Sequence, residues 1–222
     1  MPDYYMVSCR YKVIMQRKHI ITLSGKPGSG KSSTADRVAE LLGYTRYSSG
    51  QIVRSILEKE HMTMQEYNER ATDDHALDAK VDEALRSLRD RQDIVIDSRL
   101  GFYWIPESFK VYLELDIDVA TARIFTDTHS GHERSGETYH TLAEASSLVR
   151  SRMQTEHDRF SRLYRVNPFD TTHFDLVIDT SRHSPETVAI TVFDYYRSWL
   201  DSEAWKPVHS SIPVGYSFKN KY

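Results

Sequence analysis

The feature that most constrains this chain is a glycine-rich segment, residues 25–32, which reads Gly-Lys-Pro-Gly-Ser-Gly-Lys-Ser. It matches the pattern G-x-x-x-x-G-K-[ST], follows the apolar run Ile20–Leu23 and precedes an amphipathic stretch from Lys31 to Leu42. A strand, a tight loop and a helix in that order aim backbone N–H groups and the positive end of a helix dipole at one point. The segment therefore predicts a phosphate-binding loop, with Lys31 on the β- and γ-phosphates of a nucleotide and Ser32 on Mg²⁺.

The remaining apolar runs predict the fold class. Each is followed by turn residues and a helical pattern, which indicates βαβ units around a parallel sheet. We therefore expect an α/β protein: a three-layer α/β/α P-loop domain with a mainly parallel, five-stranded sheet. The expected strands are His19–Leu23, Asp93–Ile96, Lys110–Leu115 and Phe174–Ile178, with a weaker candidate at Tyr44–Tyr47.

Two segments interrupt this alternation. No strand pattern occurs between about residues 49 and 91, where Thr63 and Glu66 form a capping box, so we expect a small helical insertion. A polar stretch at about residues 127–141 is expected to be a lid, and it precedes a second capping box, Thr141 with Glu144, that opens a long helix to about Tyr164.

The domain is expected to span residues 19–204. Its last helix is predicted to begin at Ser184-Pro185-Glu186 and to continue through Trp199. Residues 1–18 would form an N-terminal extension and residues 205–222 a C-terminal tail, and their aromatic side chains suggest docking or dimer contacts.

Composition limits the partners. The chain has 222 residues, one cysteine and a formal net charge of −3, which gives no global attraction to nucleic acid or to an anionic membrane. There is no apolar run long enough to cross a bilayer and no signal-peptide pattern. We therefore expect a cytoplasmic monomer or homodimer that binds neither nucleic acid nor membrane.

A second acid is expected at the nucleotide. Asp97 ends the apolar run Ile94-Val95-Ile96, so its carboxylate would lie at the C-terminal edge of the sheet, facing the Mg²⁺ hydration shell. An alternative is that Asp97 only caps the following turn. Arg99, two residues later, would project toward the same edge.

Three charged residues share one face of the long helix. Arg152, Glu156 and Arg159 are spaced i, i+4 and i+7, so the two arginines could reach one ligand with Glu156 holding them in register. Alternatively, they form an exposed ion-pair ladder. Arginines from a closing lid are a common means of neutralising the charge of a transferring phosphoryl group.

From about His19 to Trp199, the chain resembles the cytidylate kinases, especially the short, archaeal-like branch of the nucleoside monophosphate kinases. The matching landmarks are Gly25–Ser32, Ser48-Ser49-Gly50 through Arg54, Asp78 and Asp82, Asp97 to Leu100, Arg123, Arg152 with Glu156 and Arg159, and Val177-Ile178-Asp179-Thr180-Ser181.

The resemblance implies a donor side and an acceptor side. ATP would be bound by Arg123 and by the loop residues Gly25, Lys26, Pro27, Gly28, Ser29, Gly30, Lys31, Ser32 and Ser33. The acceptor, a nucleoside monophosphate, would be bound by Ser49, Arg54, Asp78, Asp82, Arg99, Arg152, Glu156 and Arg159. Asp78 and Asp82 would lie near the base, although their i, i+4 spacing equally suits an acidic stripe on a solvated helix.

The expected reaction is an in-line transfer of the γ-phosphoryl group of ATP to CMP or dCMP, with Mg²⁺. Lys31, Arg152, Arg159 and Asp97 are the predicted catalytic residues, and Ser32 and Asp97 the predicted metal ligands. Two alternatives stay open: a P-loop kinase for another acceptor, such as AMP, UMP or a hydroxyl compound, with Asp97 as base; or a nucleotide-binding switch without catalysis.

Overall fold

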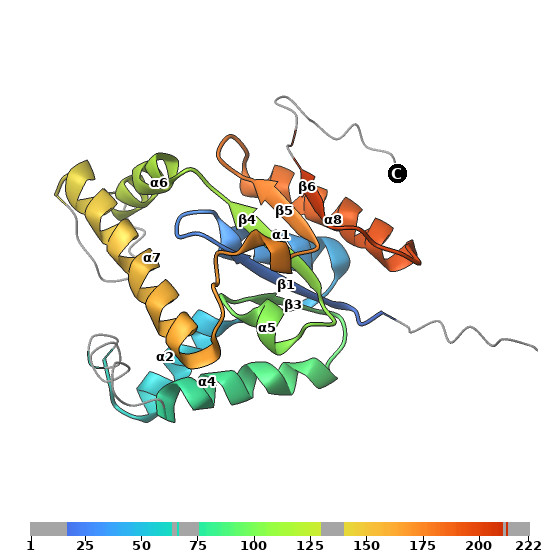
Figure 1. Ribbon diagram of the computed structural model, residues 1–222, viewed down its shortest axis with the longest axis horizontal. Helices are drawn as coiled ribbons and strands as arrows, with labels where there is room; N and C mark the ends of the chain where they lie inside the picture. Colours follow the sequence, from blue (N-terminus) through green and yellow to red (C-terminus); the bar gives the residue numbers. More distant parts are fainter. Residues whose placement is uncertain (1–16, 64–65, 67–75, 130–139, 211, 213–222) are drawn as a thin grey trace, which may run out of the picture.

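The computed structural model describes residues 17–63, 66, 76–129, 140–210 and 212. In this part of the chain, six parallel strands form one sheet with helices on both faces (Figure 1). The strands lie in the order β2-β3-β1-β4-β5-β6. Their bounds are β1 Ile20–Gly25, β2 Thr45–Ser48, β3 Ile94–Asp97, β4 Phe109–Glu114, β5 Leu176–Asp179 and β6 Val208–Ser210.

The helices begin where the sequence signals them. Thr141 Oγ1 accepts from the Glu144 amide at 3.2 Å, and the Ser184 hydroxyl accepts from the Thr187 amide at 3.4 Å. The bounds are α1 Lys31–Leu42, α2 Ser49–Lys59, α4 Ala76–Ser87, α5 Gly101–Trp104, α6 Ile117–His129, α7 Leu142–Tyr164 and α8 Pro185–Asp201, with short 3₁₀ turns η1 Leu88–Asp90 and η2 Thr171–His173.

Two predicted segments lie partly outside the described residues. The Thr63–Glu66 capping box is formed, because the Glu66 amide donates to Thr63 Oγ1 at 3.2 Å and the Thr63 amide donates to Glu66 Oε2 at 2.7 Å. The helix expected to follow it falls largely within residues 67–75, and most of the predicted lid falls within residues 130–139; neither range is described.

Alternating side chains of the strands bury both faces of the sheet. Ile21 and Leu23 of β1 pack with α1 and α8 in the larger core cluster, whereas Ile20 packs on the opposite face with Leu85 of α4 and Leu88 of η1. Every residue of β1 is buried. Strands covered on both faces read as continuous apolar runs, which is why the central strands were predictable.

The order of the strands places a crevice beside β1. The chain passes from β1 to β2 and β3 on one side, then crosses to β4 on the other, so the direction of winding reverses at β1. Ligands of open parallel sheets bind at such a reversal, beyond the carboxyl ends of the strands. Gly25 and Asp97, at the ends of β1 and β3, both lie at this edge.

The expectation of five strands is corrected by β6, which lies in the predicted C-terminal tail. Val208–Ser210 pairs with Leu176–Ile178 of β5, and the Trp205 indole N–H donates to the Asp175 carbonyl at 3.1 Å. Three residues are too few to show an alternating pattern, so β6 is defined by its pairing partner more than by its own sequence. The described part of the tail is thus packed on the domain.

We expect Trp205→Ala to lower the free energy of unfolding by about 2 kcal/mol, since the half-buried ring lies 6.0 Å from Phe109 and 6.5 Å from Tyr195, between ring centroids. Urea denaturation would measure this loss. The exposed neighbouring Lys206→Ala should change stability by less than about 0.5 kcal/mol. An unchanged unfolding midpoint in Trp205→Ala would show that the tail adds nothing to the fold.

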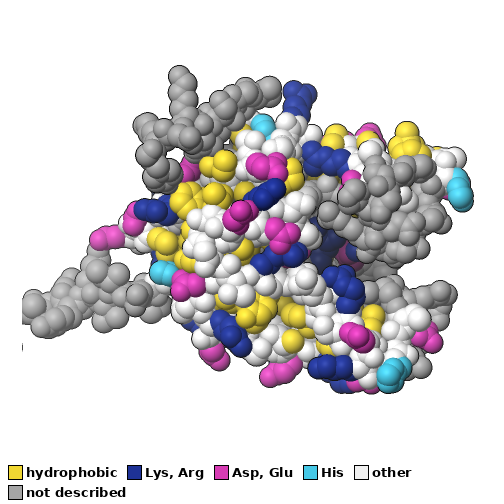
Figure 2. Space-filling view, turned by 180° about the vertical axis from the view of Figure 1, so that it is seen from behind, with side chains coloured by type: hydrophobic (Ala, Val, Ile, Leu, Met, Phe, Trp, Pro, Cys, Tyr) yellow, Lys and Arg dark blue, Asp and Glu magenta, His cyan; other side chains and the backbone are white. Residues whose placement is uncertain are grey.

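Charged side chains are mixed on the outer surface. On the face shown in Figure 2, Lys and Arg are interspersed with Asp and Glu instead of gathering by sign. Within the described residues, no helix combines the length and apolar character needed to traverse a bilayer. The positive charge needed for a phosphate ligand therefore has to be sought locally, at the crevice.

Candidate active site

The loop between β1 and α1 closes around the Lys31 ammonium. Lys31 Nζ donates to the carbonyl oxygens of Gly25 and Lys26, both at 2.9 Å. Gly30, the residue before α1, has a left-handed backbone with φ of 79°, and a Cβ on Gly25 would lie 2.4 Å from the Leu113 carbonyl oxygen. Glycine is therefore required at both positions for the loop to take this shape.

Two features of the loop suit an anionic ligand. Burial, and then the nearby Arg99 guanidinium, hold the pKa of the Lys31 amine well below its usual value. Ser29 is 3% exposed, and its hydroxyl has no hydrogen-bond partner among the described residues. Phosphate oxygens would stabilise the charged amine and accept from the buried hydroxyl, so the loop matches the predicted triphosphate site.

Ser32 and Asp97 lie together, as the sequence predicts for a Mg²⁺ site. The Ser32 hydroxyl donates to Asp97 Oδ2 at 2.7 Å, and Asp97 is 7% exposed. The same oxygen accepts from Arg46 Nη2 at 3.1 Å. These contacts hold the carboxylate at the loop and not on the turn that follows β3. A hydroxyl and a buried carboxylate at the helix N-terminus are the donors that a phosphate-bound Mg²⁺ takes from a P-loop protein.

A second group of charges connects the loop to α7. Arg99 donates through Nη1 to the Gly25 carbonyl, and its Nε donates to Glu156 Oε2 at 2.6 Å. Arg152 Nε donates to Glu156 Oε1 at 3.3 Å. Although burial opposes it, the Arg99 and Arg152 guanidinium groups hold the pKa of Glu156 below its usual value. An exposed ladder does not describe this arrangement, because Glu156 is mostly buried and its partner Arg99 comes from another segment.

Arg159, the third predicted residue of α7, contacts the insertion. Its Nε donates to Asp78 Oδ2 at 3.1 Å, and its Nη2 also pairs with that carboxylate. Asp82, one turn farther along α4, accepts from the Tyr164 hydroxyl at 2.6 Å and from the Trp104 indole N–H at 3.1 Å. Both acids are buried, at 6% and 7% exposed, so they do not form a solvated stripe.

Asp82 gives a prediction about pH. Burial raises the pKa of its carboxyl, although the Tyr164 and Trp104 hydrogen bonds act in the other direction. The folded protein thus holds the proton more tightly than the unfolded chain, whose Asp pKa is about 3.9. The stabilisation from the protonated acid is complete below that value and is lost as the pH rises through the folded pKa.

The side chain introduced by Asp82→Asn cannot ionise, so the variant does not lose this stabilisation as the pH rises. We therefore expect the difference in free energy of unfolding, variant minus parent, to increase between about pH 4 and pH 7. Urea titrations at several pH values would measure the trend. Glu83→Gln, an exposed acid on the same helix, serves as the control and should give a flat difference. If the parent instead became more stable relative to Asp82→Asn as the pH rises, the raised pKa of Asp82 would be contradicted.

The other predicted residues lie at the two ends of these groups. Ser49 begins α2, and Arg54 of the same helix is exposed, with no ion pair to another described residue. Arg123 of α6 donates through Nη2 to the carbonyl oxygens of Thr180 and Ser181, at 2.8 and 3.2 Å. The described contacts therefore join the phosphate loop to Arg99, Glu156 and Arg152, whereas Arg54 and Arg123 take no part in this group.

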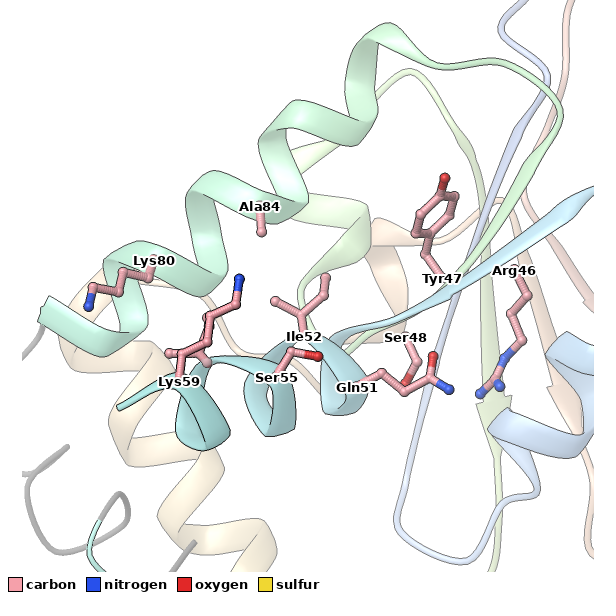
Figure 3. Close-up of a pocket in the computed structure, with 10 residues that line it drawn as sticks. Arg46, Tyr47, Ser48, Gln51, Ile52, Ser55, Lys59, Lys80 and Ala84 are labelled. Atoms are coloured by element: carbon pink, nitrogen blue, oxygen red, sulfur yellow. The ribbon is translucent and has the colours of Figure 1, made fainter. Parts of the chain in front are cut away.

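A pocket of about 380 Å³ lies between α2 and α4 (Figure 3). Its wall on α4 contains Lys80 and Ala84, whereas Asp78 and Asp82 on that helix contact α7 and α5. The pocket therefore does not include Asp78 or Asp82, but it shares Arg46 with the Ser32–Asp97 group. Its lining residues are Arg46, Tyr47, Ser48, Gln51, Ile52, Ser55, Ile56, Lys59, Lys80 and Ala84.

Sequence reasoning missed three residues that contact the predicted site. Arg46 binds Asp97, and Trp104 and Tyr164 bind Asp82. Each pairing depends on which strands and helices become neighbours, and no spacing in the sequence reveals that. The one available signal was the position of Arg46 in the weaker strand candidate, two residues before the buried Ser48.

The fold and the site together define a class of protein. A parallel sheet carries a phosphate loop after β1 and a Ser–Asp pair beside it. Arg99, which follows β3, contacts the loop, and Glu156 pairs this arginine with Arg152 of α7. This arrangement is that of a P-loop phosphotransferase.

A model of the cytidylate kinase-like family matches residues 20–182, and the chain belongs to this family. The cytidylate kinase of Halobacterium salinarum is 34% identical over 178 residues, which cover 79% of this chain and 88% of that protein. The cytidylate kinase of Natronomonas pharaonis is 31% identical over 204 residues, or 90% of this chain and all of that protein. The predicted resemblance is thereby confirmed.

Solved structures agree on the fold. Shikimate kinase from Bacteroides thetaiotaomicron superposes with a TM-score of 0.54 at 14% identity, over 82% of this chain and 98% of its own. Shikimate kinase from Acinetobacter baumannii, in complex with shikimate, gives 0.53 at 16% identity, over 82% and 95% of the two chains. At these identities the likeness shows a shared P-loop kinase architecture and carries no information on the acceptor.

Proposed function

We propose that this protein is an ATP-dependent nucleoside monophosphate kinase that converts CMP or dCMP to the diphosphate. The observation that carries the proposal is one continuous chain of contacts from the phosphate loop to α7, through Arg99 and Glu156 to Arg152. Such a chain supports the proposal because its arginines could neutralise the charge of a transferring phosphoryl group, as this reaction requires. Family relatives named cytidylate kinase support the choice of acceptor.

On the donor side, Lys31 would bind the β- and γ-phosphates of ATP, and Arg123 would lie at the adenine end. Ser32 and Asp97 would hold Mg²⁺, since a buried carboxylate beside the loop hydroxyl fits that ion. When bound, the ion neutralises charge on the β- and γ-phosphate oxygens. The exchange of the Gly25 and Lys26 carbonyls for phosphate oxygens would favour the charged form of the Lys31 amine.

On the acceptor side, Arg54 and Arg99 would bind the monophosphate, and Arg152 and Arg159 would lie between donor and acceptor. Arg99 leaves the Gly25 carbonyl to do so, while Glu156 retains it near the loop. The acceptor needs no general base, because the second pKa of a phosphate monoester is about 6 and its oxygen is already anionic at neutral pH.

Asp78 and Asp82 are the two candidate acids for reading the base. Asp82 accepts hydrogen bonds from Trp104 and Tyr164, and both oxygens of Asp78 accept from Arg159, so a base would replace one of these contacts. A carboxylate accepts from the exocyclic amine of cytosine, and uracil presents a carbonyl at that position.

We also propose that the enzyme acts in the cytoplasm on small molecules, as a monomer or homodimer, without nucleic acid or membrane.

An acceptor panel tests the function. ADP release would be measured with ATP and Mg²⁺ in the presence of CMP, dCMP, UMP, AMP or shikimate, with the Lys31→Ala protein as the background control. We expect the greatest stimulation with CMP or dCMP. Stimulation by shikimate alone would indicate a hydroxyl-acceptor kinase, and hydrolysis unaffected by every acceptor would indicate a nucleotide switch.

A further inference from the structure

Arg46 joins two carboxylates at the edge of the predicted metal site. Its Nη1 lies 3.0 Å from Asp36 Oδ1 of α1, and its Nη2 lies 3.1 Å from Asp97 Oδ2 of β3. The side chain is 19% exposed, so the guanidinium is largely shielded from water. The Asp97 side chain is 9% exposed and the Asp36 side chain 60%, so the Arg46–Asp97 pair is the shielded one and is less weakened by solvent than the Arg46–Asp36 pair.

The sheet fixes this contact. In β2, Arg46 and Ser48 point to the same face because side chains alternate, and Ser48 is the register partner of Asp97. Paired residues of neighbouring parallel strands face the same side, which here is the side covered by α1. The position of Arg46 relative to Asp97 is therefore set by the pairing of two strands and does not depend on a loop.

The two oxygens of Asp97 are used differently. Oδ2 accepts from the Ser32 hydroxyl at 2.7 Å and from Arg46, whereas Oδ1 accepts from no described residue. The two hydrogen bonds to Oδ2 oppose rotation of the carboxylate, and Oδ1 would be available to Mg²⁺ when the ion binds. Contacts of this kind behind a metal-binding group orient it for its ion.

A cation beside a Mg²⁺ site would ordinarily repel the ion. Here the charge of Arg46 is balanced by Asp36, whose carboxylate lies on the other end of the guanidinium. The Asp36–Arg46 pair as a whole is neutral, so it can orient Asp97 without adding net positive charge at the loop. Figure 3 shows Arg46 at the opposite end of the pocket from Lys59 and Lys80. Its two ion pairs are with Asp36 and Asp97.

We infer that Arg46 is a positioning residue for the metal-binding carboxylate: it locks Asp97 in the orientation that receives the Mg²⁺ of MgATP. The inference rests on the proposed function and names a residue that the family resemblance does not supply. Loss of the Arg46 side chain should therefore weaken binding of the metal ion more than it weakens binding of the nucleotide.

The test compares Arg46→Met with Arg46→Lys and Asp36→Asn. Mn²⁺ binding to the protein–ATP complex would be measured by electron paramagnetic resonance, alongside the Mg²⁺ concentration that gives half-maximal rate. We expect Arg46→Met to raise both the Mn²⁺ dissociation constant and the Mg²⁺ requirement about tenfold, with turnover at saturating Mg²⁺ within about twofold of the parent. Arg46→Lys should recover part of the loss, and Asp36→Asn should give a smaller rise.

The matched control is Arg37→Met on α1, an exposed arginine paired with Glu40 and Glu186. It should leave metal binding unchanged. An Arg46→Met protein with the parent's metal affinity, with tighter metal binding, or with an equal loss at every Mg²⁺ concentration and a lower Tm would overturn the inference. If the parent phosphorylated no acceptor, the proposed function would fail, while Mn²⁺ binding with ATP would still decide the role of Arg46.

Discussion

Lys31→Ala is expected to reduce kcat/KM for ATP by about a thousandfold or more, the largest loss for any single side chain of this protein. The amine is held at the centre of the phosphate loop by the Gly25 and Lys26 carbonyls, whereas Arg99, which also donates to the Gly25 carbonyl, is paired with Glu156. Steady-state ADP release at saturating Mg²⁺ would measure the loss.

The fold should survive this change, because Lys31 is half-buried at the loop and makes no contact with the main core cluster. Circular dichroism and the urea midpoint would therefore match those of the parent. Lys59→Ala, an exposed lysine on α2, provides the matched control and should keep parental activity. Turnover near the parental level in Lys31→Ala would remove the basis for a P-loop kinase.

Arg152→Ala is expected to lower kcat by a factor of about 10² to 10³, with a smaller change in the KM for ATP. Arg152 is half exposed, and among the described residues it is paired with Glu156 alone, so we expect its charge to be available to a transferring phosphoryl group. The comparison of kcat with KM separates this effect from simple loss of nucleotide binding.

Arg150 offers a close control on the same helix. It lies two residues earlier, is exposed, and its one ion pair with a described residue is a long contact of 3.8 Å with Asp118. Arg150→Ala should stay within about twofold of the parent, because its side chain points away from the contacts that Glu156 makes. Equal losses in the two variants would mean that α7 contributes general positive charge and no specific group.

Local signals made most of the domain predictable. The phosphate loop is defined by eight consecutive residues, and the capping boxes place the start of α7 without any knowledge of the sheet. The central strands were readable because they are buried on both faces. β6 was not, because Val208–Ser210 becomes a strand only by pairing with β5, some thirty residues away.

The side-chain partners were harder to foresee than the elements. Glu156 was expected to hold Arg152 and Arg159; it binds Arg152 and Arg99, while Arg159 binds Asp78. Helical spacing gives the residues that share a face, but which of them meets a neighbour depends on how α7 crosses α4 and β3. The catalytic and binding roles of these residues stay predictions until the variants above are measured.

The 23 residues of α7 extend over about 34 Å and contact two separate regions. Glu156 is connected to the phosphate loop through Arg99, while Arg159 and Tyr164 contact Asp78 and Asp82 of α4. Figure 1 shows the C-terminal end of α7 near α4. Because α7 is one continuous helix with contacts at both places, a tilt at one of them also changes its position at the other. The two substrates should therefore bind with positive cooperativity. Binding of the first already orders part of the protein, so the second loses less conformational entropy when it binds.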